Sequence, residues 1–105
     1  PHGLAVAVGL IAACDLSARI RVCEEGLAER VRRHILDAGM PTDLGNLSGE
    51  THWDKEAIYS SMLHDKKTVN GQINFVLMRE IGEPFVCGEV PQQLVFETLE
   101  KLGAV

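Results

Sequence analysis

Residues 4–14 have the sequence LAVAVGLIAAC, the longest apolar run in the chain. The run contains no charged residue, and Asp15 is the first one after it. A helix that is apolar on every side is normally buried in the centre of a domain, so we expect residues 4–20 to form a central helix covered on all faces. Gly9 costs about 1 kcal/mol relative to alanine in a helix, and we expect it to permit close approach of another helix or a ligand. We expect the helix to emerge into solvent at Asp15, Ser17, Arg19 and Arg21.

A second helix is predicted over residues 24–38, with two glutamates in its first turn and arginines toward its end, as the helix dipole favours. Leu27, Val31 and Ile35 recur every four residues and should form its buried stripe. Gly39 is a typical helix stop. We expect the helix to end there.

The second half of the chain predicts two more helices and a hairpin. Residues 55–64 have the apolar spacing of an amphipathic helix, and residues 73–78 alternate as a strand does. Residues 85–87 are a short partner strand, and Pro91 marks the start of a last helix. We therefore predict a mainly α fold, a helical domain with one small β-hairpin. The length fits one domain spanning residues 1–105.

Composition excludes several classes of function. A net charge of −5 argues against general nucleic-acid binding, which needs a basic surface. The apolar run is too short to span a membrane, and no signal-peptide pattern is present. Three cysteines without a C-x-x-C pair favour reduced thiols. We expect a cytoplasmic protein with no nucleic-acid or membrane partner.

Residues 64–71, HDKKTVNG, place two adjacent lysines beside one carboxylate. Asp65 can hold one ammonium group in place, and Gly71 permits a turn into the following strand. Lys66 and Lys67 would then suit an anion. The alternative is a solvated helix end, because basic residues in a last turn complement the helix dipole. Both interpretations are open on the residues alone.

The histidines offer one candidate metal ligand. His2 precedes a glycine and the apolar helix, yet one imidazole cannot hold a metal by itself, so a structural role is the alternative. We expect His34 and His52 to be solvated and Cys14 to lie in the core. No catalytic triad and no glycine-rich phosphate loop is present in the sequence. The abrupt start at Pro1 favours a fragment of a longer chain.

Five motifs occur in order: HGxAVAxG from His2, GMPT from Gly39, DKKxxxG from Asp65, FVL from Phe75 and IG from Ile81. In this order and spacing they resemble the carboxy-terminal domain of 3-dehydroquinate synthase over practically the whole chain. Related sugar-phosphate cyclases share much of the pattern. The resemblance implies a mainly helical domain.

The resemblance also implies a function. The family is a phosphate-eliminating lyase of the shikimate pathway, which leads to the aromatic amino acids. It uses NAD and a divalent metal, zinc or cobalt, to convert 3-deoxy-arabino-heptulosonate 7-phosphate into 3-dehydroquinate. The steps are transient hydride removal, phosphate elimination, hydride return and ring closure. His2 matches a metal ligand of the family, and Lys66 or Lys67 matches a lysine that binds the substrate phosphate.

By the same resemblance, the other two metal ligands and the NAD-binding domain lie upstream, so no cofactor-binding or catalytic residue is assigned within this chain. The fragment alone is expected to be inactive, and the complete enzyme to be a homodimer. This chain has Leu4 where the family usually has a glutamate, whose carboxylate would orient a ligating imidazole. Two alternatives remain: another sugar-phosphate cyclase, or a non-catalytic helical interaction module.

Overall fold

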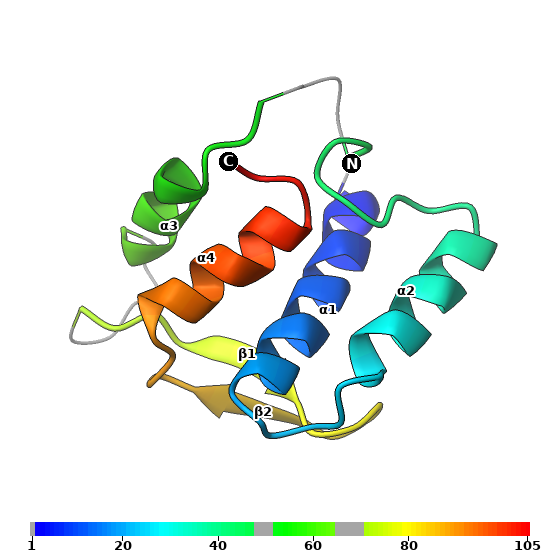
Figure 1. Ribbon diagram of the computed structural model, residues 1–105, viewed down its shortest axis with the longest axis horizontal. Coiled ribbons are helices and arrows are strands. Elements are labelled where there is room, and N and C mark those ends of the chain that lie inside the picture. The colour runs from blue at the N-terminus through cyan, green and yellow to red at the C-terminus, as the bar shows by residue number, and fades with distance from the viewer. Residues whose placement is uncertain (1, 48–51, 65–70) are drawn as a thin grey trace.

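Four helices and one β-hairpin make up the part of the chain that the computed structural model describes, residues 2–47, 52–64 and 71–105, with the backbone alone for residue 2 (Figure 1). In chain order they are α1 His2–Arg19, α2 Leu27–Asp37, α3 Lys55–Leu63, β1 Phe75–Met78, β2 Pro84–Cys87 and α4 Gln92–Lys101. The prediction of a mainly helical fold with one small hairpin is confirmed.

Helix α1 lies in the middle of this arrangement. In Figure 1, α2 is on one side of it and α4 on the other, and the hairpin crosses near its carboxyl end. Helix α3 packs on the far side of α4. The core forms where α1, β1 and α4 meet. Its buried members are Val8, Ile11, Leu16, Leu44, Leu77, Val95, Leu99, Leu102 and Ala104.

The amino-terminal half of α1 is nevertheless open on one side. Val6 and Leu10 remain 44% and 45% exposed, whereas Val8 and Ile11 are each 4% exposed. The expectation that neighbours cover the helix on all faces is therefore wrong. No other helix among the described residues approaches Gly9 closely, since a Cβ built there would meet no atom within 4 Å, and the alternative of a ligand stays a prediction.

The carboxyl half of α1 is more buried than expected. Asp15 is 7% exposed and Ser17 is fully buried, so the prediction that they bring the helix into solvent is wrong. The Ser17 hydroxyl donates to the Ala13 carbonyl at 2.6 Å and accepts from the Met78 amide at 2.9 Å. These partners replace water, which is how buried polar groups are tolerated. Arg21, which is exposed as expected, has a φ of 64° just after the helix ends.

Helix α2 begins three residues later than predicted, after the two glutamates. Its stripe is confirmed, because Leu27 is fully buried and Val31 and Ile35 pack against the core. Gly39 follows the helix with a φ of 77°, a conformation that a glycine adopts without strain.

The hairpin has the alternation that its sequence predicts. The strands are antiparallel, with Leu77 opposite Phe85 and Val76 opposite Val86. Leu77 is 1% exposed and faces the core, while Val76 and Val86 are 61% and 67% exposed.

Two backbone contacts tie the end of the chain to the region before α3. The Val105 amide donates to the Trp53 carbonyl at 2.8 Å, and the Lys55 amide donates to the Val105 carbonyl at 3.0 Å. These bonds fix the start of α3 beside the end of α4. Within the described ranges, none of the helices has both the length and the apolar character that crossing a membrane requires.

Candidate functional site

The structure describes the three residues predicted for the site only in part or not at all. His2 is the first residue of α1, and its side chain lies outside the described part. Lys66 and Lys67 lie outside the described residues altogether, in the segment between His64 and Gly71. Their roles in metal and phosphate binding therefore stay predictions, and the structure defines the elements on either side of them.

Helix α3 leads directly into the lysine segment. Asp54 caps its first turn by accepting from the Glu56 amide at 3.0 Å. At the other end, His64 Nδ1 lies 2.7 Å from the Ser60 carbonyl oxygen. Gly71 resumes the described chain with a φ of 74°. The described chain thus ends at the end of α3 on one side of this segment and resumes at a glycine turn on the other.

A surface hollow of about 370 Å³ adjoins this segment. Leu63 and Tyr59 line it from α3, and Gly71 and Gln72 line it from the chain that follows. Glu89 is the single charged residue in the described lining, and it is acidic. The described lining therefore offers no cation to an anion in this hollow.

The start of α1 and the end of α3 are separated by α4. In Figure 1, α4 lies between the two helices, and among the described elements α3 makes its helix contacts with α4. The described elements therefore do not bring the position of His2 next to the residues that flank the lysines. A site that uses both would have to include groups from elsewhere.

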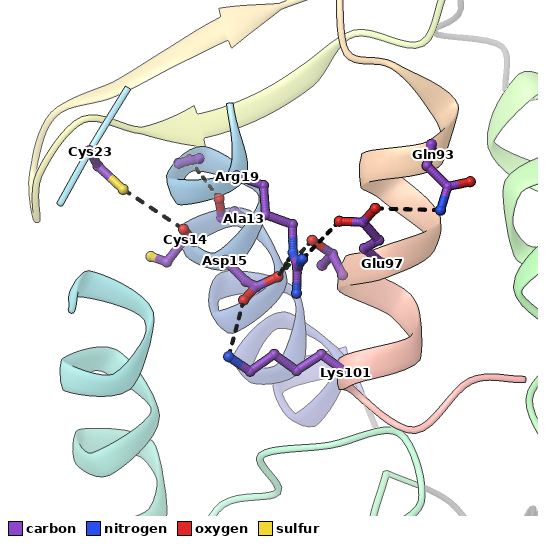
Figure 2. Close-up of polar contacts among 10 residues, drawn as sticks. Ala13, Cys14, Asp15, Arg19, Cys23, Gln93, Glu97 and Lys101 are labelled. Carbon is purple, nitrogen blue, oxygen red and sulfur yellow. Dashed lines mark hydrogen bonds and ion pairs between the residues drawn. The ribbon is translucent and has the colours of Figure 1, made fainter. Parts of the chain in front are cut away.

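A polar network that is buried at Asp15 and Thr98 and partly exposed at its other members fixes α1 against α4 (Figure 2). Asp15 Oδ2 accepts from Arg19 Nε and from Thr98 Oγ1, each at 2.7 Å. Arg19 also donates to Glu97 Oε1 at 3.0 Å, and Lys101 Nζ lies 3.6 Å from Asp15 Oδ1. The network joins two carboxylates and two cations, so its formal charges balance.

The pKa of Arg19 reports the strength of this pairing. Burial alone lowers it, but the hydrogen bonds and charges of Asp15 and Glu97 outweigh burial and raise the pKa above its ordinary value. Sequence analysis missed the network. The i,i+4 spacing of Asp15 and Arg19 was the available signal, whereas Thr98 is 83 residues away from Asp15.

A cleft of about 240 Å³ lies beside this network, between α1, α2 and α4. Its charged lining includes Glu29 and Arg32, whose side chains approach to 2.6 Å. The hydrogen bond from Arg32 is the main reason that the pKa of Glu29 falls from 4.5 to about 2. Asp15 and Lys101 form a second ion pair in the lining, which also includes the carboxylates of Glu25 and Asp43. Across the described residues, no group of three or more His, Cys, Asp or Glu side chains could hold a metal ion.

Cysteine and histidine side chains outside the predicted site behave as structural or solvated groups. Cys14 is 1% exposed, and burial is the main cause that raises its pKa to about 11. A protonated thiol in the core is a poor nucleophile. His34 and His52 are exposed, which confirms the prediction that both are solvated.

Known proteins resemble this chain over almost its whole length. The family model described as "3-dehydroquinate synthase C-terminal" matches residues 1–68. The 3-dehydroquinate synthase of Rhodospirillum rubrum is 41% identical over 98 residues, which cover 93% of this chain and 26% of that protein. Those of Ruegeria sp. (strain TM1040) and Ruegeria pomeroyi are 41% and 40% identical, over 95% and 94% of this chain and 26% of each relative.

The chain thus spans about a quarter of the length of these relatives. The family match covers more than half of the chain, and it includes the segment between α3 and β1 up to residue 68. The mainly helical fold agrees with it. This chain therefore belongs to the 3-dehydroquinate synthase C-terminal family.

Proposed function

We propose that this chain is the carboxy-terminal domain of a 3-dehydroquinate synthase. The complete enzyme would eliminate phosphate from 3-deoxy-arabino-heptulosonate 7-phosphate and close the carbocycle of 3-dehydroquinate, as a cytoplasmic homodimer of the shikimate pathway. One observation supports this above the others: about 40% identity to proteins named 3-dehydroquinate synthase, over 93–95% of the chain.

The contribution of this domain would be to bind and orient. His2 would supply one metal ligand from the first turn of α1, and the Asp15 network would hold that helix in place. Lys66 or Lys67 would bind the substrate phosphate beside the hollow at the end of α3, because an ammonium–phosphate contact is a strong, charge-assisted one.

The described residues do not complete a metal site by themselves. A zinc or cobalt ion would need further ligands from outside this chain, and NAD, which accepts and returns a hydride in the proposed reaction, would be bound by a preceding domain. We therefore expect the chain of 105 residues to be inactive alone.

The test is to assay phosphate release from 3-deoxy-arabino-heptulosonate 7-phosphate with a complete chain and with these 105 residues. Turnover by the complete chain, with none by the shorter one, is the expected result. Turnover by the 105 residues alone would refute the proposal that further metal ligands and the NAD-binding domain lie outside this chain.

The two lysines can be tested separately in the complete chain. Lys66→Ala or Lys67→Ala should weaken binding of the phosphate-bearing substrate by about 1.5–3 kcal/mol, typical of a hydrogen bond to a charged group. Arg33→Ala is the control, since Arg33 is an exposed cation on α2, on the other side of α1 from α4. If both lysine variants bind the substrate normally, the two lysines only complement a helix end.

One feature of the chain favours a second candidate. Leu4, where the family usually has glutamate, is half-buried on α1 and offers no carboxylate to orient an imidazole. A related cyclase with another sugar-phosphate substrate, or a non-catalytic interaction module, would accommodate this change. Turnover with a different sugar phosphate alone would select the cyclase, and no turnover with any would select the module.

A further inference from the structure

The cleft of about 240 Å³ between α1, α2 and α4 combines an apolar floor with a charged rim. Ile11 and Leu102 line it and are only 4% and 6% exposed, so they form its floor. The charged lining consists of the carboxylates of Asp15, Glu25, Glu29 and Asp43 and the cations of Arg32 and Lys101. Four carboxylates and two cations leave the described lining with a formal charge of −2.

The two cations of the lining leave part of this negative charge unbalanced. Arg32 donates to both carboxylate oxygens of Glu29, from Nε at 2.8 Å and from Nη2 at 2.6 Å. In the described lining, Lys101 is then the cation that remains for the other three carboxylates. None of the ion pairs in the described ranges includes Glu25 or Asp43. A cation bound in the cleft would restore the charge balance.

Asp15 contributes a carboxylate oxygen that lacks a hydrogen bond. Its Oδ2 accepts from Arg19 and Thr98, whereas Oδ1 has Lys101 Nζ at 3.6 Å, beyond hydrogen-bond distance, and no closer donor among the described residues (Figure 2). The Lys101 side chain is 68% exposed, and such an exposed ion pair contributes little. The Asp15 side chain is only 10% exposed, and buried polar atoms normally have a hydrogen-bond partner. Because Asp15 lines the cleft, a donor on a ligand there would complete its hydrogen bonding.

The arrangement of the carboxylates indicates the kind of cation. Within the part of the chain that the structure describes, no three acidic, histidine or cysteine side chains come together as metal ligands, so the rim is too dispersed for one metal ion. A molecule with separated positive charges and an apolar body fits the rim and the floor together. The volume is below the roughly 300–1,000 Å³ of pockets for drug-sized ligands, so this molecule is small.

We propose that this cleft binds a small aliphatic diamine. One ammonium group, which carries three donors, donates to Asp15 Oδ1, and the methylene chain covers Ile11 and Leu102. The second ammonium group pairs with Glu25 or Asp43 at the rim. The inference stands apart from the proposed activity, because the described lining includes none of the residues predicted for the metal and phosphate sites.

The test is a titration of the complete chain, isotope-labelled at its isoleucine methyl groups, with the diamine putrescine at constant ionic strength. The NMR signal of the Ile11 methyl group, on the floor of the cleft, should shift and reach saturation. Ile81, which is 51% exposed between β1 and β2, supplies a reference signal that should not shift. Butylamine has one ammonium group fewer and should bind about fivefold more weakly, the value of one exposed ion pair.

Two double variants locate the site. Glu25→Gln with Asp43→Asn removes the rim carboxylates, while the new amide keeps an oxygen that can accept from the Asn46 backbone amide. Putrescine should then bind no more tightly than butylamine. Asp37→Asn with Glu83→Gln is the matched control, because it removes two exposed carboxylates outside the described lining, and it should preserve the fivefold difference of about one ion pair.

Each outcome decides the proposal. A preference for putrescine that the rim variant abolishes and the control variant keeps supports it. The proposal is overturned if the Ile11 signal does not saturate, if both amines bind equally, or if both double variants lose the preference alike, which would indicate general attraction by charge. A stronger response to magnesium chloride than to putrescine also overturns it. Circular dichroism checks that the variants fold, and the comparison of the two amines on the unchanged chain decides even if one does not.

Discussion

Asp15→Ala should lower the free energy of unfolding by about 3 kcal/mol, because it leaves the buried Thr98 hydroxyl without its acceptor and removes the partly exposed ion pairs of Asp15 with Arg19 and Lys101. Asp15 is 7% exposed, and its carboxylate accepts two hydrogen bonds at 2.7 Å. Arg19 would keep its contact with Glu97. Thr98, which is 3% exposed, would lose its carboxylate acceptor inside the core, and a buried unpaired hydroxyl costs about 1–3 kcal/mol.

A double-mutant cycle with Thr98→Val tests whether Asp15 and Thr98 depend on each other, because the cost of this variant should differ between the two backgrounds. In the wild-type background this variant should cost about 1–2 kcal/mol, because Asp15 loses a donor. In the Asp15→Ala background it should be neutral or stabilising, because it removes a hydroxyl that has already lost its acceptor. The coupling free energy should therefore be about 1–2 kcal/mol.

Urea and thermal unfolding followed by circular dichroism would measure these changes. For a chain of this size, 1 kcal/mol corresponds to about 4–8 °C, so Asp15→Ala should lower the Tm by more than about 10 °C. Glu25→Gln is the control, since Glu25 is an exposed residue just before α2 and its substitution should leave the Tm almost unchanged. Equal costs of Thr98→Val in both backgrounds would refute the argument that this network holds α1 against α4.

Three further predictions follow from the charges and thiols. Cys14 should react with thiol reagents far more slowly than Cys87. The pKa of Cys14 is raised from 9.0 to about 11, so its contribution to stability should be complete below pH 9 and decline as the pH rises toward 11. Cys14→Ala should reduce this decline, and the part that remains includes Cys23, whose pKa burial also raises. Carbon-13 NMR should show that the Glu29 carboxyl titrates near pH 2. The stabilisation from its ion pairs should therefore be present above pH 4.5 and be lost as the pH falls toward 2. Arg32→Ala should return the titration midpoint toward 4.5. Calorimetry should detect no stoichiometric micromolar zinc site on the 105 residues, and such a site would contradict the need for outside ligands.

Local sequence patterns predicted the elements well and their polar contacts poorly. The stripe of Leu27, Val31 and Ile35 defined α2, because helix periodicity is a property of neighbouring residues. The burial of Asp15 and Ser17 could not be predicted in this way. Their partners Thr98 and Met78 are 83 and 61 residues away, and a polar side chain is normally assigned to solvent until such a partner is known.

The open side of α1 escaped prediction for a different reason. In sequence, an apolar residue that the rest of the fold leaves exposed looks the same as one that the fold covers. Val6 and Val8 are the same residue type two positions apart, yet they are 44% and 4% exposed. The candidate site residues His2, Lys66 and Lys67 were assigned from motifs that occur in the order found in the family. A lone histidine and two lysines do not specify a site by themselves.

Ser17 has a consequence for the outer edge of strand β1. A two-stranded sheet has an outer edge on each strand, and the free amides of such an edge can recruit strands from other molecules. At Met78 the amide of β1 is already bound by the Ser17 hydroxyl from α1. Helix α1 therefore occupies one backbone donor of that edge, and Ser17→Ala would leave this donor free for intermolecular β-pairing.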